Sequence, residues 1–283
     1  YTADPAPMVY GDTLYLYVTH DEDELLNDFY TMYDWHCFST KDMVNWTNHG
    51  KIFSLDDISW AEDRAWAPQC VERNGKFYLY CPVHKKDGGM AIAVGVSESP
   101  TGPFKDLGYP LVDEGDWNYI DPTVFIDDDG QAYIYWGNPK LYYSKLNDDM
   151  ISLNGDIQVT DLSHGFAPNE EESKYTEGPR IHKRNNKYYM LYASHGVPEK
   201  LSYSVRDSPT GPWTWGGVIM DQGNGTAFTN HPGLIEVKGR SFLFYHNQKN
   251  VSGGGYSRST AVEEFTWNAD GSIPFIKSTD NGV

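Results

Sequence analysis

The sequence repeats one pattern five times, and this repetition restricts the possible folds more than any other feature. Each copy has a polar or small residue and a proline, a short apolar run, a turn, and a second run rich in Tyr, Phe and Leu. The copies are DPAPMVYGDTLYLY from Asp4, APQCVERNGKFYLY from Ala67, DPTVFIDDDGQAYIY from Asp121, GPRIHKRNNKYYMLY from Gly178 and HPGLIEVKGRSFLFY from His231. Successive prolines are 63, 54, 57 and 53 residues apart, so the unit is longer than 50 residues throughout.

Turn-forming residues separate the two apolar runs in every copy, which predicts that each unit opens with a β-hairpin. These turns are Gly11-Asp12, Asn74-Gly75, Asp129-Gly130, Asn185-Asn186 and Lys238-Gly239. A second strand pair follows in each unit, for example LYYSKLNDDM in the third. Four short strands in a unit of this length, repeated four to eight times, are typical of a β-propeller. We predict an all-β, five-bladed β-propeller with four antiparallel strands per blade and almost no helix.

The spacing of the repeats also predicts the extent of each blade. We expect residues 1–283 to form a single domain whose blades cover approximately 1–60, 61–115, 116–170, 171–225 and 226–283. Three cysteines are too few for a secreted disulfide framework, and we interpret Cys37, Cys70 and Cys81 as core thiols. A bridge between Cys70 and Cys81 is left open by their spacing.

Composition excludes two classes of partner. The chain has 22 Lys and Arg against 40 Asp and Glu, which gives a formal charge of −18 and argues against binding to a nucleic-acid backbone. No apolar run approaches the roughly 20 residues of a membrane span. We therefore expect neither nucleic acid nor membrane as a partner.

The first residues of the repeats should lie around one mouth of the propeller channel, because the first strand of each blade runs along that channel. Three blades have a carboxylate there or one residue earlier. Asp-Pro is a common turn opener, and a single such acid is best explained as a solvated turn residue. Ala67 occupies the same position in the second blade, which indicates that the fold needs no hydrogen-bond acceptor there. The presence of an acid in three blades therefore favours a functional role for these acids over a structural one. The full ring is Asp4, Ala67 beside Trp66, Asp121, Gly178 beside Glu177, and His231.

At these acids the sequence resembles glycoside hydrolase family 43. The resemblance rests on TADPAPMVY with Asp4, IDPTVFIDDDGQAYIYWG with Asp121 and YTEGPRIHKRNNKYYMLY with Glu177, in the family's order and across essentially the whole chain. Members are five-bladed propellers acting on arabinose- and xylose-containing plant polysaccharides. The resemblance implies that Asp4 is the general base, Glu177 the general acid, and Asp121 the carboxylate that orients the acid and raises its pKa. It also implies inversion at the anomeric carbon, which needs one base and one acid but no cofactor.

Asp4 must stay ionised, and a cation is its natural partner. We select Arg258 in YSRST, with Arg180 as the alternative; a surface salt bridge would explain Arg258 equally well. His231 in TNHPGLIE resembles the family histidine that faces a metal ion, usually calcium, held largely by water in the channel. Calcium prefers oxygen ligands, so the other interpretation of His231 is a wall of the sugar pocket. The DDDG sequence at 127–130 is interpreted as a solvated turn.

A sugar pocket needs aromatic faces and polar groups. We predict substrate contacts from Trp66, Trp136, His20 and Asp21, and more loosely from Trp35 and Phe228, in addition to Arg258. For each tryptophan the competing interpretation is packing between blades.

The opening TADPAPMVY most resembles the arabinofuranosidase and mixed arabinofuranosidase/xylosidase branches of the family. The resemblance therefore implies an exo-acting inverting hydrolase that releases L-arabinofuranose, and also D-xylose, from arabinoxylan, arabinan or derived oligosaccharides. The alternatives are a β-xylosidase, an endo-arabinanase, or a noncatalytic carbohydrate-binding propeller. The expected partner is a plant cell-wall oligo- or polysaccharide. We expect a monomer that is secreted or periplasmic.

Overall fold

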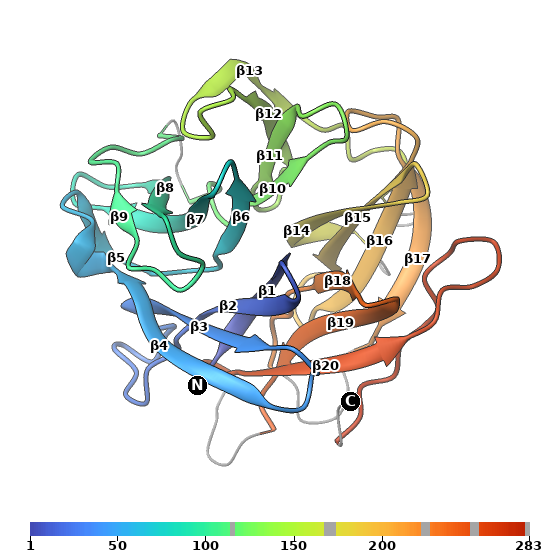
Figure 1. Ribbon diagram of the computed structural model, residues 1–283, viewed down its shortest axis with the longest axis horizontal. Helices are drawn as coiled ribbons and strands as arrows, with labels where there is room; N and C mark the ends of the chain where they lie inside the picture. Colours follow the sequence, from blue (N-terminus) through green and yellow to red (C-terminus); the bar gives the residue numbers. More distant parts are fainter. Residues whose placement is uncertain (114–116, 167–173, 222–226, 250–254, 281–283) are drawn as a thin grey trace.

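Five antiparallel sheets surround a central axis in the computed structural model, which describes residues 1–113, 117–166, 174–221, 227–249 and 255–280 (Figure 1). Strands β1, β6, β10, β14 and β18 are the innermost ones in this view. Helical structure in the described residues is limited to the 3-10 turn η1 (Leu55–Asp57), and none of their helices is long and apolar enough to cross a membrane. The predicted all-β, five-bladed propeller is confirmed.

The strands follow the chain order blade by blade. Blade one contains β1 (Ala3–Tyr10), β2 (Thr13–Thr19), β3 (Asp34–Thr40) and β4 (Trp46–Ser54). Blade two contains β5 (Ala61–Asp63), β6 (Gln69–Arg73), β7 (Lys76–Lys85), β8 (Met90–Ser97) and β9 (Lys105–Asp106). Blade three contains β10 (Thr123–Ile126), β11 (Ala132–Trp136), β12 (Tyr142–Leu146) and β13 (Leu153–Val159). Blade four contains β14 (Tyr175–Arg184), β15 (Lys187–Ser194), β16 (Lys200–Arg206) and β17 (Thr214–Met220). Blade five contains β18 (Gly233–Val237), β19 (Arg240–Asn247) and β20 (Ser259–Phe265).

Two blades depart from four strands. In blade two the long strand β7 pairs with both β5 and β6 along one edge, which gives five strands. In blade five the described residues form three strands. The expected blade boundary near residue 60 falls between β4 and β5, whereas those near 115, 170 and 225 lie outside the described residues.

The opening hairpins have the turns that their sequences favour. Both turn residues have positive φ at Asn74-Gly75, Asn185-Asn186 and Lys238-Gly239, as a type I′ turn requires. Each connects strands separated by two residues, so the register of the hairpin is fixed by the turn. In these three blades the turn motif therefore fixes where the inner strand ends and how it pairs with the next strand.

Large aromatic and aliphatic side chains fill the space between blades. Tyr17, Tyr80 and Tyr135 are fully buried, each on the second strand of its hairpin. Cys37, Cys70 and Cys81 are buried free thiols, so the interpretation as core thiols holds and no Cys70–Cys81 bridge is present.

Blade five packs closely on blade one. A Cβ on Gly233 would lie 2.5 Å from the carbonyl oxygen of Pro5 and 2.7 Å from Cδ of Pro7, so only glycine permits this approach of β18 to β1. The backbone nitrogen of Thr2 donates to the carbonyl oxygen of Arg258 at 3.0 Å. These contacts bring the start of the chain beside β20 and close the ring.

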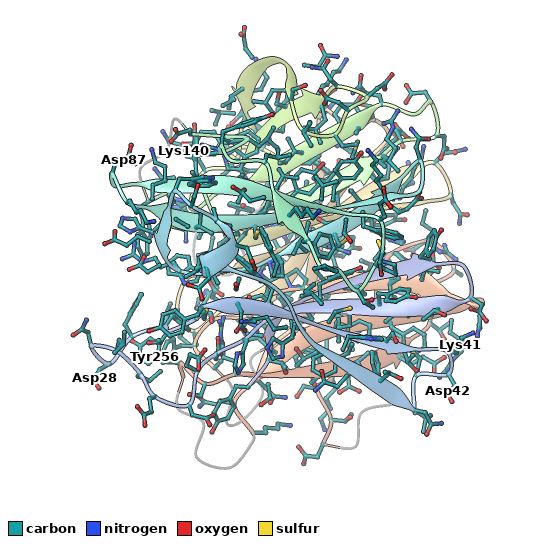
Figure 2. The ribbon with its side chains drawn as sticks, turned by 60° about the vertical axis from the view of Figure 1, so that its left-hand side comes forward. Asp28, Lys41, Asp42, Asp87, Lys140 and Tyr256 are labelled. Carbon is teal, nitrogen blue, oxygen red and sulfur yellow. The ribbon has the colours of Figure 1, made fainter. Side chains whose placement is uncertain are left out.

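The two ends of the channel carry different loops. Because β1 and β2 are antiparallel, the start of β1 and the end of β2 lie at the same end of the blade, and the loop 20–33 projects there. Figure 2 shows Asp28 of this loop and Tyr256 on one side of the molecule, with Lys41 and Asp42 on the other.

Candidate active site

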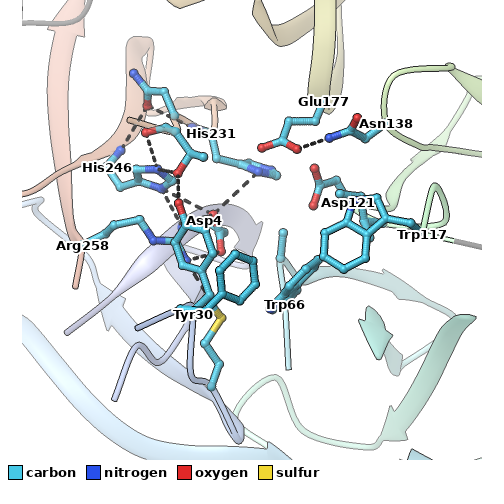
Figure 3. Close-up of a pocket in the computed structure, with 16 residues that line it drawn as sticks. Asp4, Tyr30, Trp66, Trp117, Asp121, Asn138, Glu177, His231, His246 and Arg258 are labelled. Carbon is cyan, nitrogen blue, oxygen red and sulfur yellow. Dashed lines mark hydrogen bonds and ion pairs between the residues drawn. The ribbon is translucent and has the colours of Figure 1, made fainter. Parts of the chain in front are cut away.

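A pocket of about 120 Å³ lies where the inner strands begin (Figure 3). Every blade contributes a side chain to the lining, either from the first residue of its repeat or from the residue directly before it. These five residues are Asp4, Trp66, Asp121, Glu177 and His231. The pocket is therefore built from the same short stretch of each blade, with a different side chain supplied each time.

An unusual backbone conformation aims the acids into this pocket. Asp4 and Asp121 have φ of +51° and +57°, in a region that residues other than glycine rarely occupy. The pairing of β1 with β2 also shifts register between Ala3 and Ala6, as in a β-bulge, which redirects side chains. Such strained conformations concentrate at functional sites.

In the fourth blade the aligned position holds a glycine instead of an acid. Gly178 occupies the aligned position with φ of +61°, and a Cβ there would lie 3.2 Å from Nδ1 of His231. Glycine at 178 thus leaves room for the imidazole. The carboxyl group comes instead from the preceding residue, Glu177, whose longer side chain extends into the pocket.

Asp4 is buried in a cluster of donors. Its Oδ1 accepts from Nη1 of Arg258 at 3.0 Å, and its Oδ2 accepts from the hydroxyl of Thr19 at 2.8 Å. Burial by itself would raise the pKa of Asp4, but the charge of Arg258, the neighbouring His246 and His231, and the Thr19 hydrogen bond together lower it. Asp4 is therefore suited to remain an anion.

Arg258 is held in place by a second carboxylate. Nε and Nη2 of Arg258 donate to the two oxygens of Asp21 at 2.9 and 2.8 Å, and its guanidinium lies 4.6 Å from the ring centroid of Tyr30. Arg180, the alternative partner of Asp4, donates to the carbonyl oxygen of Pro7 at 2.7 Å. The cation paired with Asp4 is thus Arg258.

His246 fixes the backbone of Asp4. Its Nδ1 accepts from the Asp4 amide at 3.2 Å, and its Nε2 lies 2.9 Å from the carbonyl oxygen of Thr229. Burial and the charge of Arg258 lower the pKa of His246 to about 3. A neutral ring protonated on Nε2 satisfies both contacts, so His246 serves as a neutral support.

Glu177 has the opposite electrostatic environment. Burial and the charge of Asp4 raise the pKa of Glu177. A hydrogen bond from Nδ2 of Asn138, at 2.5 Å, lowers it, but the net shift is upward. Asp121 accepts from the backbone amide of Gly178 at 2.9 Å, and burial followed by the charges of Glu177 and Asp4 raises its pKa well above the usual value. Close carboxyl groups of this kind keep a proton between them.

Glu199 is a further buried carboxyl group behind the acid. It is 1% exposed, its Oε2 accepts from the Asn230 amide at 2.7 Å, and it forms a side-chain hydrogen bond with Glu177. Burial and the charge of Glu177 raise its pKa well above the usual value. A protonated Glu199 can donate this hydrogen bond, which would hold the carboxyl group of Glu177 in place.

His231 points between Asp4 and Glu177 (Figure 3). Its Nδ1 is 3.9 Å from Oδ1 of Asp4, and burial lowers its pKa to about 4, so the imidazole is neutral near pH 7. Among the described residues, no group of three or more metal-ligating His, Cys, Asp or Glu side chains includes His231. This donor set does not fit a calcium ion bound directly by a cage of protein oxygens.

Aromatic rings form the outer wall. Trp66 and Trp117 are perpendicular with centroids 5.2 Å apart, and the guanidinium of Arg64 lies 4.9 Å from the Trp117 ring centroid. Phe29 and Tyr30 from the loop 20–33 line the pocket as well. Their faces suit the apolar C–H surface of a sugar.

Several predicted contact residues lie outside the lining. Trp136 is fully buried and stacks on Tyr142 at 5.8 Å, as its competing packing interpretation proposed, and Trp35 is likewise buried against Phe53. Phe228 packs on Tyr256 at 4.9 Å, behind the wall. Asp21 is fully buried and acts on Arg258. His20 pairs with Asp34 at 2.9 Å, away from the pocket.

Sequence reasoning missed some of the pocket residues. Asn138 lies shortly after the end of β11 and His246 near the end of β19, each the second strand of its hairpin. Because second strands end where first strands begin, the repeat alignment contained a signal for both. Tyr30 and Trp117 come from irregular segments and had no such signal.

The family assignment follows from comparison with known proteins. Residues 1–273 match the sequence profile described as Glycosyl hydrolases family 43. The chain belongs to glycoside hydrolase family 43. Among family 43 relatives, it is 33% identical to xylosidase/arabinosidase 43A of Humicola insolens over 96% of each chain. It is 32% identical to a xylosidase/arabinosidase of Bacteroides ovatus, covering 99% of this chain and 96% of that one.

A solved structure gives the same assignment. A family 43 β-xylosidase/α-arabinofuranosidase from a compost microbial metagenome, in complex with xylotriose and in calcium-free form, is 31% identical, with a TM-score of 0.89 and coverage of 98% of this chain and 94% of that one. The family 43 chain described here is thus a glycoside hydrolase.

Proposed function

We propose that this glycoside hydrolase is exo-acting and inverting, and that it releases terminal L-arabinofuranosyl and D-xylosyl units from arabinoxylan, arabinan or derived oligosaccharides. One observation carries the proposal: a single pocket holds Asp4, whose pKa is lowered, and Glu177, whose pKa is raised. An inverting glycosidase needs an ionised base and a protonated acid of this kind.

The roles follow from these charges. Asp4 takes a proton from water as the water oxygen bonds to the anomeric carbon, and Glu177 gives its proton to the departing glycosidic oxygen as that bond breaks. Asp121, fixed by the Gly178 amide, forms with Glu177 a buried carboxyl pair that retains a proton, and this favours the protonated form that the acid needs. Arg258 keeps Asp4 ionised.

The relatives support both sugars. The most similar proteins given above are named for xylosidase and arabinosidase activity together, and an α-L-arabinofuranosidase from Clostridium thermocellum is 37% identical with a TM-score of 0.79. The small pocket volume, about 120 Å³, favours one terminal sugar over a polysaccharide chain lying across the face. This supports exo action rather than an endo-arabinanase.

The deciding experiment compares hydrolysis of an aryl α-L-arabinofuranoside with that of an aryl β-D-xyloside, followed by product analysis on arabinoxylan and arabinan. We expect turnover of both aryl glycosides and monosaccharide as the sole early product. Early oligosaccharide products would indicate an endo-arabinanase. A noncatalytic carbohydrate-binding propeller would give no turnover, and Glu177→Ala would then leave sugar binding and activity unchanged.

A plant cell-wall saccharide as substrate implies a secreted or periplasmic enzyme, in keeping with the extracellular exo-α-(1→5)-L-arabinofuranosidase of Cellvibrio japonicus, which is 26% identical. We also propose that the protein is a monomer.

Any channel calcium would contact His231 and otherwise be held by water, since the described side chains supply no oxygen cage there. Elemental analysis of the purified protein tests this ion.

A further inference from the structure

A second cluster of polar side chains lies in blade one, outside the pocket. His20 directly follows β2, and Asp34 and His36 are the first and third residues of β3. Residues two apart in a strand share a face, and the His20 amide donates to the Asp34 carbonyl at 3.3 Å, which places His20 opposite Asp34. The three side chains therefore meet on one face of the blade.

The distances within this cluster are short. Oδ1 of Asp34 is 2.9 Å from Nδ1 of His20 and 3.1 Å from Nε2 of His36, and Oε1 of Glu22 is 3.6 Å from Nδ1 of His20. One ligand atom from each of His20, Asp34 and His36 lies within 4.8 Å of the others. The two imidazole rings are 4.5 Å apart.

We propose that His20, Asp34 and His36 bind a divalent transition-metal ion such as Zn²⁺, with water in the fourth position. In a tetrahedral zinc site with bonds of about 2.0 Å, neighbouring ligand atoms are about 3.3 Å apart, and the Asp34 oxygen lies 2.9 and 3.1 Å from the two imidazole nitrogens, slightly below that value. Two imidazoles with a carboxylate favour zinc and other first-row transition metals over magnesium or calcium.

The site is open to an ion from solvent. The side chains of His20, Asp34 and His36 are 27%, 17% and 21% exposed. Without an ion, a single Asp34 oxygen serves both imidazoles. A bound ion would replace these shared hydrogen bonds with separate bonds from each side chain.

The position of the cluster gives the ion a structural consequence. His20 and Asp34 flank the segment 21–33, which carries Phe29 and Tyr30 to the pocket and Asp21 to Arg258. An ion bonded to both flanking residues would fasten the two ends of this segment together. Metal binding should therefore raise Tm and lower KM for the sugar, while kcat changes less.

The test is calorimetric titration of metal-stripped protein with Zn²⁺, together with thermal unfolding in the presence and absence of Zn²⁺. We expect one ion per chain with a dissociation constant on the order of micromolar, weakened by about 100-fold in His36→Ala, since even groups behind a ligand contribute 10- to 100-fold. Asp34→Asn keeps the shape of the side chain and should weaken binding as well, so a folding defect in one variant does not decide the result.

His84 provides the matched control. Its Nδ1 lies 3.1 Å from Asp63 and 3.3 Å from Glu62, a pairing of one histidine with two carboxylates. His84→Ala should bind Zn²⁺ as the unaltered protein does. Absence of saturable binding, equal binding by His36→Ala and Asp34→Asn, or loss of binding in His84→Ala would each overturn the proposal.

Discussion

Arg258 and Asp4 are 254 positions apart in the chain and form a buried ion pair, with Nη1 and Oδ1 separated by 3.0 Å. The pair joins the first inner strand, β1, to the residue directly before the last described strand, β20. It exists because blade five packs against blade one, and it sets the charge state of the proposed base.

Replacing that cation should change the acidic side of the pH profile. A lysine in place of Arg258 would carry a point charge that cannot bind Asp4 and Asp21 as the planar guanidinium does, so Arg258→Lys should raise the pKa of Asp4. Because the base must be ionised, the acidic limb of kcat/KM should move to higher pH. Arg180→Lys is the control, since Arg180 binds the Pro7 carbonyl; an equal shift there would contradict the assignment.

Removal of either proton-transfer group should nearly abolish turnover. We expect Asp4→Asn and Glu177→Gln each to lower kcat by more than about a hundredfold, because general acid and base groups contribute about 10²- to 10⁴-fold. Stopped assays with aryl glycosides measure this. Asp12→Asn, on the exposed turn of the first hairpin, should leave kcat unchanged; a comparable loss there would point to a general folding effect.

Asp121→Asn should act through the acid. An amide at 121 cannot ionise, so the buried pair no longer resists the loss of a proton; the pKa of Glu177 falls and the basic limb of the pH profile moves to lower pH. The profile of kcat against pH for this variant is the measurement. An unmoved limb would show that the two carboxyl groups are not coupled.

The released sugar should have the anomeric configuration opposite to that of the substrate linkage. In the proposed mechanism water attacks while Glu177 protonates the leaving oxygen, so no glycosyl-enzyme forms. Proton NMR in the first minutes, before mutarotation, distinguishes the products. Retention, or a covalent sugar trapped on Asp4, would indicate instead the closer carboxyl pair, about 5 to 5.5 Å apart, of a retaining enzyme.

Two tryptophans should respond differently to substitution. Trp66 lines the pocket, so Trp66→Ala should raise KM by roughly tenfold through loss of an aromatic face. Trp136 is fully buried between aromatic neighbours, so Trp136→Phe should cost about 1 to 3 kcal/mol of stability while KM stays unchanged. Steady-state kinetics and thermal unfolding of both variants check the contrast; a raised KM in Trp136→Phe would place that ring nearer the sugar than its burial indicates.

The repeat made much of this molecule predictable from sequence. Hairpin turns and aligned prolines determine where inner strands begin, which is why Asp4, Asp121 and Glu177 could be placed around one mouth before the fold was known. Arg258 was selected for its charge alone, and the structure pairs it with Asp4.

The loops were less predictable because they do not follow the repeat. Tyr30 reaches the pocket from the segment 21–33, which lies outside the repeated hairpin. His20 was assigned to the sugar from its position after β2, yet its ring turns toward Asp34. Direction of a side chain at a strand end depends on neighbours across the sheet, which a single unit of sequence does not reveal. The strand numbers of blades two and five likewise depend on pairing beyond the repeated hairpin.

In every blade the pocket is lined from the aligned position or the residue beside it, and this has a consequence for how such enzymes can diversify. Duplication of one ancestral unit would create five equivalent slots around one cavity, each supported by its own hairpin. A change in one slot, such as the alanine at 67, leaves the backbones of the other four in place. New sugar preferences can therefore arise one blade at a time, without rebuilding the framework that holds the acids.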